Sequence, residues 1–165
     1  MKTDALTSLP ALGALWPEQG GYFAGITQDA AGATFAVIVA VENPDSKFKM
    51  AEWGGYGKDA PGATHWTDGL ANTQALAAAK TDHPAADVCT SYTHEGHADW
   101  YLPSIGELQL AHMHCRSLFD AEGYYWSSTQ YGRYDAWVQH FEYGYSDYFY
   151  KCYERRVRPF RRFPL

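Results

Sequence analysis

Residues 131–163 read YGRYDAWVQHFEYGYSDYFYKCYERRVRPFRRF, and the centre of this stretch, AWVQHFE at 136–142, alternates its side chains with a period of two. That period predicts a β-strand with two distinct faces. The face with the large aromatic side chains is expected to point into the core and consists of Trp137, Gln139 and Phe141. The mixed face is expected to point to solvent and consists of Ala136, Val138, His140 and Glu142.

Strand character also occurs on both sides of this segment. Further strands are predicted at 22–27, 34–41, 124–130 and 156–163. Turns are predicted at 29–32, where the sequence is DAAG, and at Gly144, and NPD at 43–45 is expected to end the second strand. The early pair of strands therefore forms a hairpin, and the later strands follow one another after Gly123.

Two helices are predicted between the early and the late strands. DGLANTQALAAAK at 68–80 is expected to form a helix with Asp68 as its N-cap, and His83-Pro84 is expected to stop it. SIGE at 104–107 fits a capping box, and the helix is expected to continue to residue 118. Its apolar face consists of Leu108, Ala111, Cys115 and Leu118. The order of elements along the chain, with strands first, then two helices and then further strands, predicts an α+β fold rather than alternating βαβ units.

The composition fits one globular domain spanning residues 1–165. Hydrophobic residues make up 46% of the chain and charged residues 19%, which excludes a disordered chain. Asp4 and Pro10 interrupt the N-terminal apolar residues, so no signal peptide is expected. No stretch approaches the ~18 apolar residues of a membrane span, so no membrane insertion is expected. We expect synthesis in the cytoplasm, with the protein then virion-associated or displayed at a cell surface.

The net charge of −6 is unevenly distributed. Residues 1–154 contain eight Lys or Arg and all 19 Asp or Glu, whereas residues 155–165 contain five Arg and no acid. A basic tail on an acidic body predicts that the tail folds back onto carboxylates, as a last strand that includes Arg156, Arg158, Arg161 and Arg162. Nucleic-acid binding through this tail is the alternative; it predicts salt-sensitive association and is the less favoured of the two.

The residues that usually carry catalysis or bind metals do not form a known pattern. His94, His97, His112, His114 and Cys115 offer a ligand set, but His112 and His114 lie about 200° apart around a helix. Three cysteines are too few for a disulfide scaffold, and Cys115 fits a core thiol. No motif for a nucleophile, a phosphate loop or a dinucleotide is present. We therefore expect no enzyme activity, no cofactor and no metal.

The tyrosine content of the opening stretch is the strongest functional indication. Seven of the 13 tyrosines lie between Tyr131 and Tyr153, among Asp, Ser and Gly residues. Tyrosine provides a large amphipathic contact area at low entropic cost, and small polar residues adapt around it, as in antibody paratopes. The alternative is that these tyrosines fill a small core, but no Leu or Ile lies between Leu118 and Leu165 to accompany them. The composition favours a binding surface.

Several segments in order resemble a known family. The segments are DWYLPSIGEL (99–108), YYWSSTQ (124–130), AWVQHF (136–141), Gly144, Lys151 and RVRPFRR (156–162). They resemble the domains named for the C-terminal domain of a collagen-like adhesin, Lcl. Within that group the chain is similar to the variable proteins of diversity-generating retroelements, which GGYFAGI (20–26) and WTDGLANTQAL (66–76) also fit.

The resemblance implies the C-type lectin fold, of the type found in formylglycine-generating enzymes, with two helices packed on a central antiparallel sheet region. It implies a scaffold at 1–130, a variable ligand-binding region at 131–155 and a C-terminal strand at 156–165. In such proteins error-prone reverse transcription replaces adenines, chiefly in Asn codons, and no Asn follows Asn72. The residues reachable in this way, and thus the implied ligand-binding set, are Tyr131, Gly132, Arg133, Tyr134, Asp135, Val138, His140, Tyr143, Tyr145, Ser146, Asp147, Tyr148, Tyr150, Cys152 and Tyr153.

Other residues of the segment match positions that the family keeps. These are Ala136, Trp137, Gln139, Phe141, Gly144 and Lys151, whereas Glu142, Phe149, Glu154 and Arg155 are ambiguous. The resemblance thus implies a non-enzymatic protein that recognises a protein or glycan target on another cell or a host surface, as in phage receptor binding. A formylglycine-generating-enzyme-like oxidase is the alternative, but Cys152 has no second cysteine near it in sequence. ENPD at 42–45 does not match the calcium-binding motifs of lectins, so calcium-dependent sugar binding is not expected.

Overall fold

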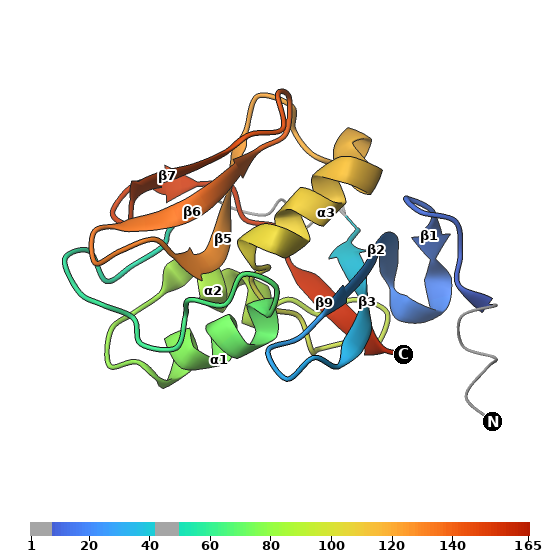
Figure 1. Cartoon of the computed structure of the whole chain (residues 1–165), viewed down its shortest axis with the longest axis horizontal. Coiled ribbons are helices and arrows are strands. Elements are labelled where there is room, and N and C mark those ends of the chain that lie inside the picture. The colour runs from blue at the N-terminus through green and yellow to red at the C-terminus, as the bar shows by residue number, and fades with distance from the viewer. Residues whose placement is uncertain (1–7, 42–49) are drawn as a thin grey trace.

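A computed structural model describes residues 8–41 and 50–165, and this part of the chain combines three α-helices with antiparallel strands (Figure 1). A four-stranded sheet contains, in spatial order, β1 (Leu15–Trp16), β2 (Gly21–Gln28), β3 (Thr34–Ala40) and β9 (Phe160–Pro164). A three-stranded sheet contains β5 (Tyr124–Gln130), β6 (Asp135–His140) and β7 (Ser146–Tyr150). A short ladder pairs β4 (Ala51–Glu52) with β8 (Glu154–Arg155). The predicted α+β class is confirmed.

The hairpin β2–β3 forms where the sequence predicts it. The Asp29 carboxylate accepts hydrogen bonds from the amides of Ala31 and Ala33, both at 2.9 Å, and thereby closes the turn. After Thr34 every residue of β3 is buried, because β2 and β9 flank this strand and hydrophobic clusters cover both of its faces. The NPD segment that was expected to end the second strand lies outside the described residues.

Helix α1 (Gly69–Ala78) begins at the predicted N-cap, where the Asp68 carboxylate accepts a hydrogen bond from the amide of Ala71 at 2.9 Å. The prediction for His83-Pro84 is incomplete, because Pro84 also begins helix α2 (Pro84–Thr90). Proline is tolerated in the first turn of a helix, where its missing N–H would have no intrahelical acceptor. The described residues therefore contain one helix more than the two predicted.

Helix α3 (Ile105–Cys115) begins at the predicted capping box, and the short 3-10 helix η3 (Arg116–Leu118) follows it to the predicted end. Leu108, Ala111 and Cys115 are buried on its apolar face, as predicted, and Leu118 is half-buried. This face packs against β2 and β6, so α3 lies between the two larger sheets (Figure 1). Among the described residues, no helix has the length and apolar character needed to cross a membrane.

The fully buried carboxylate of Glu107 joins three segments of the chain. Its Oε2 accepts hydrogen bonds from the amide of Gly69 at 3.0 Å and from the amide of Ser104 at 2.8 Å, and its Oε1 accepts one from the hydroxyl of Tyr101. Burial raises the pKa of Glu107 to about 7, although these hydrogen bonds favour the charged form. One side chain thus ties the start of α1, the start of α3 and the segment before α3.

The C-terminal segment connects the two larger sheets. The amide of Trp126 donates to the carbonyl of Arg156 at 2.9 Å, and four residues later Phe160 exchanges two backbone hydrogen bonds with Tyr101. The strand predicted at 156–163 therefore begins later than expected, because β9 starts only at Phe160. Pro159 has no N–H to donate to a strand ladder, which explains the interruption.

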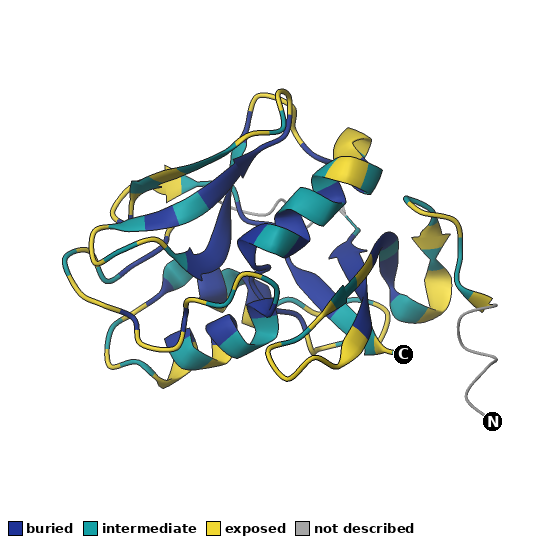
Figure 2. Cartoon of the chain, in the orientation of Figure 1, coloured by how far each residue is buried: buried dark blue, intermediate teal, exposed yellow. Residues whose placement is uncertain are grey.

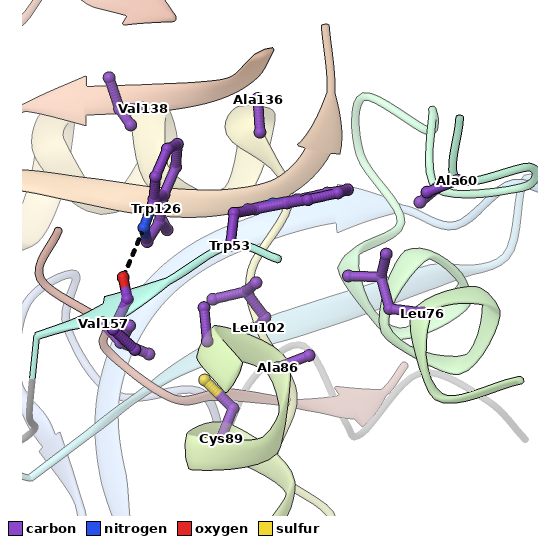
Figure 3. Packing of buried hydrophobic residues seen from close by; sticks show 13 residues of the cluster. Trp53, Ala60, Leu76, Ala86, Cys89, Leu102, Trp126, Ala136, Val138 and Val157 are labelled. Carbon is purple, nitrogen blue, oxygen red and sulfur yellow. Dashed lines mark hydrogen bonds between the residues drawn. The ribbon is translucent and has the colours of Figure 1, made fainter. Parts of the chain in front are cut away.

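A hydrophobic cluster around two tryptophans supports the three-stranded sheet (Figure 3). Trp53 and Trp126 are fully buried, and each indole N–H donates to a backbone carbonyl at 2.8 Å, that of Ser127 and that of Ala51 respectively. Ala136 of β6 packs into the same cluster. Figure 2 shows buried residues running through the centre of the larger sheets, with exposed residues along the loops.

Replacing Glu107 with alanine is expected to lower the free energy of unfolding by about 2–4 kcal/mol, because two buried amides lose their acceptor. Glu107→Gln is expected to cost less, since its amide oxygen can still accept from both amides. Urea unfolding followed by tryptophan fluorescence measures both losses. Glu142→Ala, at an exposed site, is the control and should stay within about 0.5 kcal/mol of the wild type. Equal losses for Glu107→Ala and Glu142→Ala would contradict the role given to Glu107.

The raised pKa of Glu107 also predicts a pH dependence. Between its ordinary pKa of 4.5 and the folded-state value of about 7, the folded protein holds a proton that the unfolded chain has released. The stability contributed by this group therefore falls as the pH rises through that window. Glu107→Gln does not titrate, so its free energy of unfolding should decline less than that of the wild type over the same window. Parallel pH profiles for the two proteins would show that the Glu107 carboxyl titrates normally.

Candidate ligand-binding face

The seven tyrosines of the opening stretch all lie at the surface. Their exposed fractions run from 42% at Tyr145 to 74% at Tyr143. They lie on β7 and on the turns around β6, β7 and β8, at one end of the molecule (Figure 1). The alternative that they fill a small core is therefore wrong. We call this surface the tyrosine face, and its members are Tyr131, Tyr134, Tyr143, Tyr145, Tyr148, Tyr150 and Tyr153.

The side of β6 that was expected to point outward is buried instead. Val138 is fully buried and His140 is only 6% exposed, whereas Trp137, expected in the core, is half-buried beside the tyrosine face. β6 is the central strand of its sheet; the tryptophan cluster covers one side of it and α3 packs on the other. A period of two separates core from solvent only where one side of a sheet is open. Val138 is therefore inaccessible to a ligand.

One group of aromatic rings surrounds Trp137. The rings of Tyr131 and Tyr148 stack in parallel with their centroids 4.0 Å apart. Trp137 meets them edge-on at 5.1 and 5.9 Å, and Trp66, from the loop before α1, meets Trp137 at 5.4 Å. Rings that already support one another lose little conformational freedom when a ligand binds, which favours affinity.

A second group of rings gathers around Tyr150. Tyr56, from the glycine-rich loop at 53–64, meets Tyr134 at 5.3 Å and Tyr150 at 5.7 Å, and Tyr150 meets Tyr153 at 5.6 Å. All these contacts are steeply inclined, with interplanar angles of 62°, 82° and 62°. The group therefore joins a scaffold tyrosine to three tyrosines of the face.

A third group surrounds His140. Its imidazole lies between the parallel rings of Tyr143 and Tyr145, with centroid distances of 5.4 and 5.0 Å. The hydroxyls of Tyr124 and Tyr145 share a hydrogen bond of 2.5 Å, and this bond raises the pKa of Tyr145 to about 12. The Tyr145 phenol is therefore neutral at physiological pH and can donate a hydrogen bond.

A buried lysine fixes the turn between β7 and β8. Lys151 is fully buried, and its Nζ donates to the carbonyl of Lys58 at 2.9 Å and to the side-chain oxygen of Gln130 at 2.7 Å. Its backbone amide donates to the carbonyl of Tyr134 at 2.8 Å. Burial lowers the pKa of Lys151 to about 8. This residue thus ties the turn to two other loops beneath the tyrosine face.

Two other residues that match fixed family positions are also constrained. Gly144 has a φ of 75°, and a Cβ there would lie 2.5 Å from the ring of His112, so both backbone conformation and space require glycine. Gln139 is fully buried, and its side-chain oxygen accepts a hydrogen bond from the hydroxyl of Ser146 at 2.7 Å. Ala136 and Phe141 are fully buried as well.

The sequence-predicted ligand-binding residues fall into three classes of exposure. Those exposed are Tyr131, Arg133, Tyr134, Tyr143, Tyr145, Tyr148, Tyr150, Cys152 and Tyr153. Gly132, Asp135, Ser146 and Asp147 are partly exposed, and Val138 and His140 are buried. Three further residues were not predicted from the sequence: Tyr56 and Tyr124, whose rings contact the face, and Trp66, whose ring contacts Trp137 beside it. Each precedes the variable segment in the chain, and sequence spacing does not indicate that such rings meet it.

The arginines of the C-terminal segment are engaged by the body of the protein. Three bind carboxylates, as predicted: Arg156 binds Asp120 at 2.8 Å, Arg161 binds Asp99 at 2.8 Å and Arg162 binds Asp68 at 3.3 Å. The buried guanidinium of Arg158 donates to the backbone carbonyls of Ala40 and Leu118. The fold-back of the tail is thus confirmed, and carboxylate partners are confirmed for Arg156, Arg161 and Arg162.

His94 and His97 pair with each other in a short β-bridge, whereas His112, His114 and Cys115 lie on α3. Across residues 8–41 and 50–165, no group of three His, Cys, Asp or Glu side chains could hold a metal ion. His97 donates from Nε2 to the carbonyl of Glu18, whereas the ring of His112 lies beside Phe141. Cys89 and Cys115 are buried, which confirms Cys115 as a core thiol, and Cys152 is exposed.

The sequence model of the Lcl C-terminal domain family matches residues 42–161. The match spans the three helices, the three-stranded sheet and the whole tyrosine face. The chain belongs to this family, as its motifs indicated, although GGYFAGI at 20–26 lies outside the matched residues. No curated protein matches the chain.

Replacing Lys151 with methionine is expected to lower the free energy of unfolding by about 1–3 kcal/mol, because the carbonyl of Lys58 loses a buried donor. Lys58→Met, at an exposed side chain, is the matched control and should change stability by less than about 0.5 kcal/mol. Hydrogen exchange should also accelerate at the amide of Gly57, which lies in the loop that Lys151 holds. Unchanged exchange and equal stability for the two variants would show that the buried ammonium does not hold the loop.

Proposed function

We propose that the protein is a non-enzymatic ligand-binding protein that uses the tyrosine face to recognise a protein or glycan on another cell or a host surface. The observation that carries this proposal is the exposure of all seven tyrosines in mutually supported groups on one sheet. Aromatic side chains of this kind supply most of the binding energy in many interfaces. Membership of the Lcl C-terminal domain family is consistent with a variable ligand-binding protein. Display on a virion or at a cell surface belongs to the same proposal.

The proposal includes the C-type lectin fold for the whole chain. Three features support it. The terminal strand β9 returns to pair with β3 of the N-terminal hairpin, the helices α1 and α3 lie between the early and late strands in sequence, and β5–β6–β7 forms a separate sheet that carries the loops. In this division residues 1–130 are the scaffold, 131–155 the variable region and 156–165 the closing strand.

The proposal also includes diversification of the face by adenine-directed mutagenesis. Its support is the agreement between burial and the division into variable and fixed positions that the resemblance implies. Four of the residues that match fixed positions, Ala136, Gln139, Phe141 and Lys151, are fully buried. The residues of the implied ligand-binding set are exposed or partly exposed except at two positions, Val138 and His140. Substitution at exposed positions usually changes stability little, so such a set can vary while the fold persists.

The alternative functions have less support from the contacts. An oxidase of the formylglycine-generating type would need a second thiol beside Cys152, and the other two cysteines are buried in separate hydrophobic clusters. Nucleic-acid binding through the tail would need free guanidinium groups, and Arg156, Arg161 and Arg162 each bind a carboxylate.

Sequencing the encoding locus tests the proposal. A second, near-identical copy of the codons for residues 131–153 is expected close to a reverse-transcriptase gene, with adenines wherever the two copies differ. The differences should fall at the exposed tyrosine positions and spare the codons for Gln139, Phe141 and Lys151. Differences at bases other than adenine, or codons at the tyrosine positions that no adenine change produces, would refute diversification.

A further inference from the structure

A hollow of about 270 Å³ opens on the tyrosine face near the end of β7. It is lined by Asp135, Tyr148, Phe149, Tyr150 and Tyr153. Pockets that enclose a whole small molecule usually measure about 300–1,000 Å³. The size of this hollow therefore suits one side chain of a larger partner rather than a complete small ligand.

The rings around the hollow are set at steep angles to one another. Tyr150 meets Tyr153 at 62° on one side and Tyr56 at 82° on the other. A cation placed between steeply inclined rings can meet more than one ring face, as it does in an aromatic cage. A stacked pair would instead present a single flat platform.

The only acidic group of the lining is Asp135. It lies directly opposite Tyr150 in the β6–β7 ladder and is partly buried. Within the described residues, no hydrogen bond or ion pair engages its carboxylate. The buried ammonium of Lys151 interacts with this carboxylate through space but makes no direct ion pair with it. The hollow therefore combines an aromatic wall with a negative charge that a second cation beside it would stabilise further.

We infer that this hollow binds an organic cation, and that its occupant is a lysine or arginine side chain of a partner protein. The inference rests on the proposed function and narrows it, because a neutral glycan would gain nothing from the charge of Asp135. It also makes the specificity a property of this variant, since Asp135, Tyr150 and Tyr153 all belong to the set reachable from Asn codons.

The chain's own arginine shows that these rings accept a guanidinium group. Arg155 lies 4.4 Å from the ring centroid of Phe149 and 5.4 Å from that of Tyr153. Phe149 alternates with Tyr148 and Tyr150 along β7, so its side chain points to the opposite side of the sheet. Arg155 thus occupies the reverse side, where its Nη1 donates to the carbonyl of Glu154, and the hollow itself remains open.

Two peptides of equal shape and different charge test the inference: acetyl-Gly-Lys-Gly-amide and the same peptide with norleucine in place of lysine. NMR titration of the 15N-labelled protein should give saturable shifts at the amides of Asp135, Tyr150 and Tyr153 with the lysine peptide. An arginine peptide should behave in the same way. The norleucine peptide should bind about 2- to 5-fold more weakly than the lysine peptide.

Substitutions then locate the site. Asp135→Asn and Tyr150→Ala should each weaken binding of the lysine peptide by about 2- to 5-fold. Glu142→Gln, which removes an exposed carboxylate outside the hollow, should leave it unchanged. The same spectra report whether each variant remains folded.

Three results would overturn the inference. Equal binding of the norleucine peptide would remove the role of charge, and unchanged affinity in Asp135→Asn would remove the role of the carboxylate. Choline binding more tightly than both the lysine and the arginine peptides would replace the protein partner with a quaternary ammonium headgroup. None of these results bears on the locus comparison, so failure of the cation site and failure of the diversified face are distinguishable.

Discussion

The ammonium group of Lys151 is buried beneath the most exposed part of the protein. Its Nζ bonds to Lys58 and Gln130 and lies 4.7 Å from the ring centroid of Trp53. Removing a charge from water costs several kcal/mol unless hydrogen bonds and other electrostatic contacts offset it, and here two acceptors and an aromatic ring do so. Since three loops meet at this side chain, the tyrosines that those loops carry are held in fixed relation to one another.

This arrangement separates the requirements of folding from those of recognition. The residues that hold the hairpin β6–β7 are buried or sterically constrained, as at Gln139, Phe141 and Gly144. The tyrosines are attached to that frame at exposed positions, so we expect their replacement to leave the frame intact. Rings held in place before binding lose little entropy on binding, which is how an exposed surface of this size can gain affinity.

Local features of the fold were predictable from the sequence because their determinants lie within a few residues. The N-cap at Asp68, the capping box at Ser104 and the hairpin turn at Asp29 all formed as predicted. The orientation of the β6 side chains was not predictable, because elements distant in the chain cover both sides of this strand. Helix α2 was not predicted because Pro84 was interpreted only as the end of the preceding helix. For the site, composition identified the tyrosines, whereas their partners Tyr56 and Tyr124 emerge only from tertiary contacts.

The central claim is that the tyrosine face is carried by the fold and does not help to form it. The most direct measurement is the urea unfolding of a variant in which Tyr131, Tyr143, Tyr148 and Tyr153 are replaced together by serine. A cooperative transition is expected, with a free energy of unfolding within about 2 kcal/mol of the wild type, and the difference should arise from lost ring contacts. A variant that does not fold would contradict the account, because the tyrosines would then belong to the structural core.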